Sequence, residues 1–434
     1  MGTKKTSSRF WAALVIFSLV GQIAWVMENM YFNVFIYQMF HASANAISGM
    51  VAASAVAATV TTLLVGAFSD KVGKRKGFIC GGYILWGISI LCFALIRVDI
   101  IGKFFPYASA AAVGVTLTII MDCIMTFFGS SANDACFNAW LTDSTDDTNR
   151  GAVEGINSMM PLLAILAVFG GFMGFDLTKL ESWTAIFILI GSAVILLGIA
   201  GFWLICEPKL DTRGNESYFK NLFYGFRPRV IRENPGFYLA LAAYAVFNIA
   251  IQIFMPYLIL YYTVSLGIDN YVLIFAPAIL LAAAFTFFYG KQYDKHGFRS
   301  AILAPIAMLM AGFVVLYFCK STVPVFLGTL VMLCGYLAGM AMFGAIIRDK
   351  TPAGKAGMFQ GRRIVGQVLV PGVIGPAIGA AVLKNAETVL NNDGTTSFVP
   401  NENIFLAAFI AAIFIWVVLI PLFRKLNEMA KASP

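Results

Sequence analysis

The chain has 434 residues, of which 60% are hydrophobic and only 12% are charged, and its formal net charge is +8. Soluble domains carry about 25% charged residues, so this chain has too few polar side chains to cover a soluble fold. The composition therefore excludes a soluble globular protein and predicts one that folds in a lipid bilayer.

Twelve apolar runs are long enough to cross a membrane, which takes about 20 residues of helix. The predicted spans are residues 10–39, 44–68, 77–97, 105–128, 151–175, 183–206, 237–264, 270–290, 301–319, 323–347, 362–383 and 404–423. The fourth is expected to continue as helix past the membrane, through SSANDACFNAWLTD at 130–143. The predicted fold class is an all-α membrane protein with twelve transmembrane helices.

The positive charges indicate which ends of the spans face the cytoplasm. If both termini are cytoplasmic, 25 of the 30 Lys and Arg residues lie on the inner side and five on the outer side. Inner loops of membrane proteins are enriched in Lys and Arg, so we expect both termini on the cytoplasmic side of the plasma membrane. The net positive charge is then an orientation signal, and we expect no nucleic-acid partner.

The longest inner connection, residues 207–236, is polar and basic and separates two sets of six spans. We expect an N-terminal six-helix bundle at 1–206, a cytoplasmic linker at 207–236 and a C-terminal six-helix bundle at 237–434. Nothing in the spacing of the spans predicts a second copy, and we expect a monomer.

Motifs that carry enzyme chemistry are absent from the sequence. The two histidines and seven cysteines are scattered without metal-ligand spacing, and no phosphate loop, G-x-S-x-G or H-E-x-x-H pattern occurs. We therefore expect no enzyme activity, no metal and no cofactor, and we interpret the cysteines as buried packing residues rather than disulfides.

Two pairs of loop motifs repeat between the halves. The pattern G-x3-D-K-x-G-x-R occurs at 66–75 and again at 290–299, an offset of 224 residues. A second pattern, an aspartate followed by G-x3-G, occurs as Asp143 with 151–155 and as Asp349 with 357–361. Both offsets join equivalent loops of a six-span repeat, and many secondary transporters are built from such repeats.

The first pattern, in the loop after the second span and echoed after the eighth, resembles the signature of the major facilitator superfamily. The resemblance implies a fold of two pseudo-symmetric six-helix bundles. The first span, with GQIAWVMENMYFN, and the acid-rich end of the fourth, before TDSTDDTNRG, are more similar to the glycoside/sugar–cation symporters and the sucrose transporters. The chain departs from the sodium-coupled glycoside branch because its second span has no carboxylate before Asp70.

The matched loops are predicted to act as inner gates. Glycines at 66 and 73 permit close helix approach and a tight turn. The superfamily resemblance implies that Asp70 faces the start of the eleventh span, and that Asp294 faces the fifth span near Arg150. The remaining basic residues of the first loop are interpreted as contacts to lipid headgroups. The predicted gate residues are Gly66, Asp70, Gly73, Arg75, Asp134, Asp143, Arg150, Gly290, Asp294, Gly297, Arg299, Asp349, Arg362 and Arg363.

Polar and aromatic residues in the first and seventh spans predict a solute-binding face. At about 100° per residue, one arc of the first span holds amides and aromatic rings, with Glu28 on its flank. Amides and carboxylates suit sugar hydroxyls, and rings can stack on the apolar faces of pyranoses. The predicted face comprises Gln22, Trp25, Glu28, Asn29, Phe32 and Asn33, and in the seventh span Tyr244, Asn248 and Gln252.

Two carboxylates are predicted at membrane depth, Glu28 near the middle of the first span and Asp122 within the fourth. Ionisable residues there are costly and indicate function by default. An alternative interpretation of Glu28 is a packing contact that is hydrogen-bonded to a neighbouring helix. Neither histidine lies in mid-membrane, so Glu28 and Asp122 are the candidates for proton coupling. We place Tyr257, Tyr261 and Tyr262 in an aromatic belt at the outer surface.

Together these features predict a secondary active transporter that works by alternating access. We expect it to carry a small polar solute, most simply a sugar or glycoside, in symport with a cation, a proton rather than sodium. The main alternative is proton-coupled efflux of drugs or metabolites, against which the amides of the first and seventh spans argue. A sensor or scaffold derived from a transporter is a second alternative, which the two gate motifs disfavour.

Overall fold

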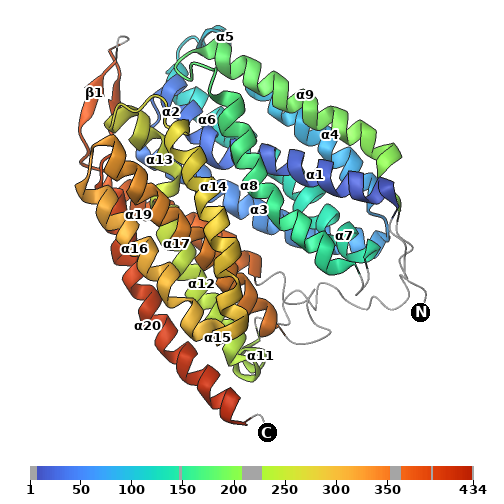
Figure 1. The fold of residues 1–434 in the computed structure, drawn as a ribbon. Helices are drawn as coiled ribbons and strands as arrows, with labels where there is room; N and C mark the ends of the chain where they lie inside the picture. Colours follow the sequence, from blue (N-terminus) through green and yellow to red (C-terminus); the bar gives the residue numbers. More distant parts are fainter. Residues whose placement is uncertain (1–6, 146–148, 208–226, 352–362, 392–393, 433–434) are drawn as a thin grey trace. The chain divides into compact units, whose positions relative to one another are not determined.

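The computed structural model describes residues 7–145, 149–207, 227–351, 363–391 and 394–432 (Figure 1). Twelve of its helices are long and apolar enough to cross a membrane, which confirms the predicted number of spans. The chain divides into two compact units, Met1–Phe219 and Lys220–Pro434, with the division inside the predicted linker. Each unit is described by itself.

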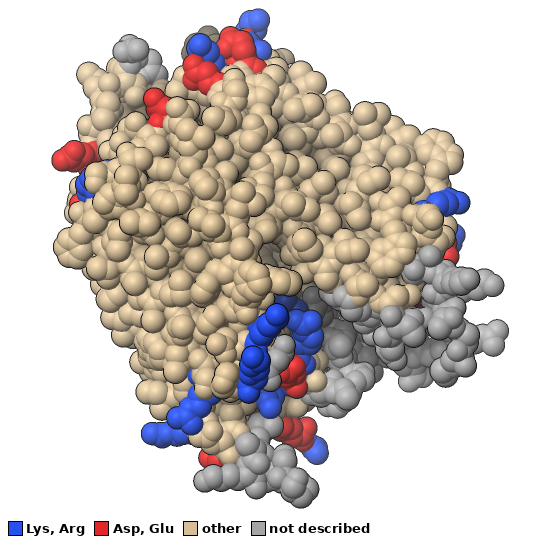
Figure 2. Space-filling model, viewed as in Figure 1, with Lys and Arg blue, Asp and Glu red and all other residues tan. Residues whose placement is uncertain are grey.

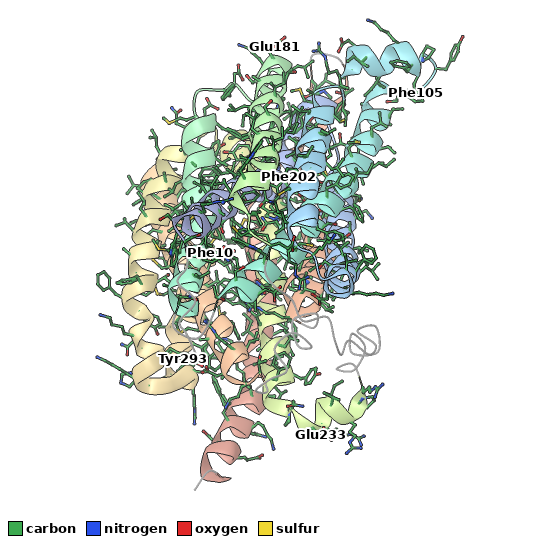
Figure 3. All side chains as sticks on the ribbon, turned by 90° about the vertical axis from the view of Figure 1, so that its right-hand side faces the viewer. Phe10, Phe105, Glu181, Phe202, Glu233 and Tyr293 are labelled. Carbon is green, nitrogen blue, oxygen red and sulfur yellow. The ribbon has the colours of Figure 1, made fainter. Side chains whose placement is uncertain are left out.

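The first unit contains six spans. They are formed by α1 (Ser8–Val26), η1 (Met27–Tyr31) and α2 (Phe32–Phe40); α3 (Ala44–Val72); α4 (Lys76–Phe93); α6 (Ala110–Gly129), η2 (Ser130–Phe137) and α7 (Asn138–Ser144); α8 (Arg150–Phe172); and α9 (Leu180–Leu204). A short helix, α5 (Val98–Phe104), precedes α6. The continuation of the fourth span as helix through residue 143 is confirmed. Figure 3 places Phe105 and Glu181 at one end of this unit, and Phe10 lies nearer the other, as alternating spans require.

Local signals in the sequence set the helix boundaries of this unit. Ser43 and Ser109 each accept a hydrogen bond from a backbone N–H of the first turn, at the starts of α3 and α6. Gly73 ends α3 in the left-handed conformation, with φ 67°. Inside the unit, α4 packs closely on α9, where a Cβ at Gly87 would lie 2.6 Å from the carbonyl oxygen of Gly191. Such close approach of backbones is typical of membrane helix packing.

The second unit contains the other six spans. They are formed by α12 (Pro235–Phe254), η4 (Met255–Tyr257), α13 (Leu258–Leu260) and η5 (Tyr261–Ser265); α14 (Val272–Tyr289); α15 (Lys291–Ala301) leading into α16 (Leu303–Phe318); α17 (Thr322–Asp349); η6 (Val365–Leu369) with α19 (Val370–Val382); and α20 (Asn403–Ala432). The short helix α11 (Pro228–Glu233) precedes α12. Between α19 and α20 lies an antiparallel hairpin of β1 (Thr388–Leu390) and β2 (Thr396–Phe398), with Thr388 opposite Phe398.

The helix flanks carry the apolar surface that a bilayer requires. Leu196 is 65% exposed on α9 and Phe287 is 74% exposed on α14. On the face shown in Figure 2, the Lys, Arg, Asp and Glu side chains gather at the ends of the helices, and the surface between them is uncharged. An uncharged band between charged ends is the arrangement expected of helices that span lipid.

Candidate functional site

The first unit holds a buried carboxylate that is bound by two hydroxyl groups. Glu28 lies in the π-helical turn η1 and is 6% exposed. Its Oε1 accepts hydrogen bonds from Ser54 Oγ at 2.6 Å and from Thr126 Oγ1 at 2.8 Å, and the two hydroxyls lie 2.9 Å apart. Its Oε2 is buried with no hydrogen-bond partner in the described part of the chain. Oε1 of Glu28 is therefore held in place by hydrogen bonds, and Oε2 can bind another group.

A second carboxylate lies one helical turn from Thr126. Asp122 on α6 is 2% exposed, and its Oδ1 is also buried without a hydrogen-bond partner among the described residues. Asp122 and Glu28 are close enough to interact electrostatically. Two carboxylates held together in a water-poor interior are costly unless a proton or another cation is bound with them. The pair is therefore suited to bind and release a cation.

The remaining predicted residues of the first span do not all share one face. Trp25 packs on Trp86, with ring centroids 5.0 Å apart, and Asn29 is exposed. Asn33 is fully buried, and its amide donates to the carbonyl oxygen of Asn29 at 3.0 Å. Gln22 is half-buried.

The prediction for Phe32 is wrong, because Phe32 packs in an apolar ring cluster with Phe93, at 4.4 Å, and Phe187, at 5.9 Å. The π-turn of η1 inserts an extra residue into the helical repeat and changes the phase of everything that follows it. An arc drawn with uniform helical geometry therefore fails beyond Glu28.

In the second unit, the predicted stripe lies on α12. Tyr244 stacks on Phe343, and its hydroxyl lies 3.2 Å from Sδ of Met340. Asn248 is 7% exposed, and its amide donates to the carbonyl oxygen of Tyr244 at 2.9 Å. Gln252 is half-buried beside Gly375, where an added Cβ would lie 2.5 Å from Cβ of Gln252.

The prediction of an aromatic belt at 257–262 is wrong, because Tyr257, Tyr261 and Tyr262 are all fully buried. Tyr262 shares a hydrogen bond with the hydroxyl of Thr329, and Tyr261 accepts one from Lys320 Nζ at 3.2 Å. A buried tyrosine whose hydroxyl finds a partner contributes both apolar area and a directed bond. These rings belong to the core of the second unit and not to a lipid-facing surface.

The predicted inner loop of the first unit forms an ionic cluster around Arg75, which is 4% exposed. Its guanidinium pairs with Asp70, donates to Asp143 Oδ2 at 2.9 Å and donates to Ser69 Oγ at 2.6 Å. Partial burial opposes ionisation, but the hydrogen bond and charge of Asp70, followed by those of Asp143, raise the pKa of Arg75 above its ordinary value. Three predicted gate residues are thus brought together.

Glu207 completes this cluster, and nothing in the sequence pattern had marked it. Its carboxylate accepts hydrogen bonds from the backbone N–H groups of Arg75 and Lys76, the latter at 3.2 Å, at the start of α4. A carboxylate at a helix N-terminus satisfies donors that have no partner inside the helix. The signal in the sequence was a single acid directly after the sixth span, which only the fold brings to α4.

The matched loop of the second unit also has a glycine with positive φ, but ψ is 24° at Gly73 and 174° at Gly297, and the contacts differ. Gly297 has φ 71°, close to the 67° of Gly73. Arg299, however, is exposed and lies over the ring of Phe423, 5.7 Å from its centroid. Asp349 accepts a hydrogen bond from the hydroxyl of Tyr293.

The other predicted gate residues lie apart from these clusters or outside the described residues. Asp134 lies in η2 and accepts a hydrogen bond from Ser130 Oγ at 3.0 Å. Gly66 lies within α3 and Gly290 directly after α14, and Arg363 donates to Gln367 at 3.2 Å. Arg362 and the side chains of Arg150 and Asp294 lie outside the described residues.

Comparison with known proteins identifies the family. The family model of the Major Facilitator Superfamily matches residues 13–342. None of the curated proteins matches the chain.

Several solved structures share the fold. A mutant form of the nucleoside transporter NupG is 12% identical, with a TM-score of 0.71 over 95% of this chain and 99% of its own. A bacterial homologue of the human lysosomal transporter Spinster is 15% identical, with a TM-score of 0.70 over 98% of both chains. A D-xylose–proton symporter is 13% identical, with a TM-score of 0.71 over 94% of this chain and 97% of its own.

These structures establish the fold, and the family model covers well over half of the chain. Twelve helices long and apolar enough to span a membrane accompany that match. The protein therefore belongs to the major facilitator superfamily, and it is an integral multi-pass membrane transporter and not an enzyme.

Proposed function

We propose that the protein is a proton-coupled symporter of a sugar or glycoside, with Glu28 and Asp122 as the proton-binding groups. The observation that carries the proposal is the buried carboxylate pair, in which Glu28 Oε2 and Asp122 Oδ1 have no hydrogen-bond partner in the described part of the chain. A buried carboxylate without a cationic partner is stable when it binds a proton and unstable when it loses one. Such a pair can link solute binding to proton binding.

The choice of a proton over sodium rests on the donor set around Glu28. The carboxylate is surrounded by two hydroxyls on one oxygen, and α3 carries no carboxylate before Asp70. Hard cations such as sodium need several oxygen ligands around one point, whereas a proton needs only one or two. The solute class rests on amide and aromatic side chains, led by Asn248 and Trp25. Two structurally similar proteins are a D-xylose–proton symporter and a nucleoside transporter.

The residues predicted for the solute face and the gates are carried over as part of this proposal. Gln22, Trp25, Asn29 and Asn33 in the first unit, with Tyr244, Asn248 and Gln252 in the second, contact the solute. The cluster of Asp70, Arg75 and Asp143 closes the inner side. The charge distribution of the loops supports a plasma-membrane protein with both termini in the cytoplasm, working as a monomer by alternating access.

The test is uptake into proteoliposomes of radiolabelled D-xylose, sucrose, an aryl glucoside and uridine, each driven by a pH gradient or by a sodium gradient. We expect at least one of the sugars or glycosides to accumulate with the pH gradient alone. Glu28→Gln should abolish that accumulation. Glu181→Gln, which changes an exposed carboxylate at one end of the first unit, should leave the accumulation intact. Accumulation driven only by sodium, or expulsion of a cationic dye without sugar uptake, would contradict the proposal.

A further inference from the structure

Polar side chains recur at every fourth position of the fourth span. The segment TLTIIMDCIMTFFGSSANDACFNAWLT has an apolar composition typical of a transmembrane helix, yet it has a polar residue at six positions spaced four apart. The row consists of Thr118, Asp122, Thr126, Ser130, Asp134 and Asn138. Polar residues within a membrane helix are costly and are expected to face the protein interior. Thr116, Ser131 and Asn133 lie off this row, but six polar residues at one regular spacing call for a physical reason.

The π-helical segment η2 lets this row stay on one side of the helix. Four residues of an α-helix turn by about 40° more than a full circle, so a four-residue spacing would drift round the helix over the five steps of the row. The wider turns of η2, Ser130–Phe137, counteract that drift. Thr118, Thr126 and Ser130 are fully buried, whereas Ile120 and Ile124 on the opposite flank are 51% and 40% exposed.

The row is buried from Thr118 to Ser130 and becomes accessible at its last two members. Asp122 is 2% exposed and Ser130 is fully buried, Asp134 is half-buried, and Asn138 is exposed. The row therefore leads from the carboxylate pair in the middle of the span to the surface of the unit. In the topology proposed above, this end is cytoplasmic.

Hydrogen bonds already join successive members of the row. Thr126 Oγ1 donates to Glu28 at 2.8 Å, Ser130 Oγ donates to Asp134 Oδ2 at 3.0 Å, and Asn138 donates to the carbonyl oxygen of Asp134 at 3.2 Å. The Cβ atoms of residues four apart on a helix lie about 5–6 Å from each other, a gap that one water molecule spans. Along the path from Glu28 through Thr126, Ser130 and Asp134 to Asn138, the step between Thr126 and Ser130 is the one without a direct hydrogen bond among the described residues. The steps from Thr118 to Asp122 and from Asp122 to Thr126 have none there either.

Asp134 differs from the carboxylates of the inner loop. Asp70 and Asp143 both pair with Arg75, whereas Asp134 forms no ion pair within the ranges that the structure describes. Asp134 lies near enough to interact electrostatically with Glu28 of η1 and with Tyr83 of α4. The Asp70–Arg75 cluster lies instead against Cys136, on another side of η2.

We propose that Asp134 is the inner proton acceptor of the transporter, and that the row from Ser130 to Thr126 relays the proton between Asp134 and Glu28. In the inward direction, Glu28 releases one proton toward Thr126, the hydroxyls and one bridging water each accept one proton and pass one on, and Asp134 receives it and releases it to the cytoplasm. The relay groups are unchanged at the end of each transfer. This proposal rests on the proton coupling proposed above and replaces the gate role that the sequence favours for Asp134.

The test is hydrogen–deuterium exchange of the buried carboxyl groups, followed by infrared spectroscopy of the purified full-length protein in lipid. No transported solute is needed. The C=O band of Glu28 is assigned as the difference between the wild type and Glu28→Gln, at a pH where it is present. After transfer from light to heavy water, we expect Asp134→Asn and Ser130→Ala to slow the shift of that band by about 100-fold, the scale of a lost proton-transfer group.

Ser131→Ala is the matched control. Ser131 lies in the same π-helical segment and is buried, but its hydroxyl donates to the carbonyl oxygen of Phe127 and lies off the row. We expect this variant to exchange at the rate of the wild type. Equal rates in Asp134→Asn and in the wild type would overturn the relay while leaving proton coupling through Glu28 standing. If no carboxyl band depends on Glu28 or Asp122 at any pH, the proposed coupling and the relay that rests on it both fail.

Discussion

The two units differ sharply in which polar side chains they bury. The first unit buries the charged residues Glu28, Arg75 and Asp122. Within the described part of the second unit, the buried polar side chains other than tyrosine are Asn248, Thr329 and Ser397. Every buried side-chain nitrogen or oxygen that has no hydrogen-bond partner among the described residues also lies in the first unit. Among the described residues, the two halves thus share a helical plan but differ in that the first buries charged side chains.

The matched loops show where the halves remain alike. Gly73 and Gly297 both adopt a positive φ, 67° and 71°, although ψ is 24° at the first and 174° at the second. Arg75 is buried among carboxylates, whereas Arg299 is exposed over an aromatic ring. The two loops therefore share a glycine with positive φ, and among the described residues the buried arginine held by carboxylates belongs to the first unit.

The largest expected effect separates coupling from binding. Asp122→Asn in the first unit should reduce pH-driven accumulation by about 100-fold, the contribution of a proton-transfer group. Exchange of solute without a gradient should continue, because that process moves no net proton. Asn248→Ala in the second unit should instead raise the half-saturation concentration about tenfold, equivalent to about 1.4 kcal/mol, and remain coupled. Uptake and counterflow assays of both variants measure these effects. The same change in both variants would contradict the assignment of proton coupling to the first unit and of solute affinity to the second.

The next effect concerns stability of the two loops. Arg75→Ala leaves the carboxylates of Asp70 and Asp143 without their cation, and we expect a loss of about 3 kcal/mol. Arg299→Ala removes only an exposed contact to Phe423 and should cost at most about 1 kcal/mol. Unfolding in mixed micelles with increasing denaturing detergent measures both. Comparable losses would show that the exposed Arg299 contributes as much to the free energy of unfolding as the buried Arg75.

A smaller effect concerns the two glycines with positive φ. Gly73 is in the left-handed region, with ψ 24°, where alanine should cost about 1–2 kcal/mol. Gly297 has ψ 174°, a conformation essentially restricted to glycine, and an added Cβ meets no neighbouring atom within 4 Å. We therefore expect Gly297→Ala to lose more stability than Gly73→Ala in the same unfolding assay, and equal losses would contradict this expectation.

The smallest effect comes from an exposed ion pair in the second unit. Lys320 Nζ lies 2.6 Å from Glu402 Oε2. Burial opposes the ionisation of Glu402, but the hydrogen bond from Lys320 lowers the pKa of Glu402 below its ordinary 4.5. Burial likewise opposes ionisation of Lys320, but the hydrogen bonds to Glu402 and Tyr261 raise the pKa of Lys320 above its ordinary 10.5.

The stabilisation by this pair is therefore complete between pH 4.5 and 10.5. It is lost on the acid side as the pH falls through the lowered pKa of Glu402, and on the basic side as the pH rises through the raised pKa of Lys320. Glu402→Gln should cost less than about 1 kcal/mol at neutral pH. The variant should also lose less stability than the wild type on acidification, as measured by thermal unfolding across pH. If the variant and the wild type lose the same stability on acidification, the pair does not contribute to the stability of the fold.

Much of the fold could be predicted from composition and local pattern. Span count follows from the length of apolar runs, and the long fourth helix follows from the residues after 128. Gly73 and Gly297 could be recognised as turn residues because they repeat at matched positions. The hairpin at 388–398 was missed although VLNNDGTTSF carries an Asn-Asp-Gly turn signal.

The site was less predictable because its contacts are long-range. Glu28 was recognisable as a buried acid, but its partners Ser54 and Thr126 lie 26 and 98 residues away. Helices with apolar residues on every side carry no pattern that tells a lipid-facing surface from a core, so Tyr261 was assigned to the wrong environment. The π-turns of η1 and η2 shift the phase of a helix without any local sequence mark.

The central claim, that the buried carboxylates of the first unit carry the proton, is tested most directly by counting protons. Proteoliposomes loaded with a pH-sensitive dye and held without a membrane potential should acidify when a transported sugar is added outside. We expect one proton to enter with each sugar in the wild type, in Asn248→Ala and in Glu181→Gln, and none in Glu28→Gln. Undiminished acidification in Glu28→Gln and Asp122→Asn would contradict the account.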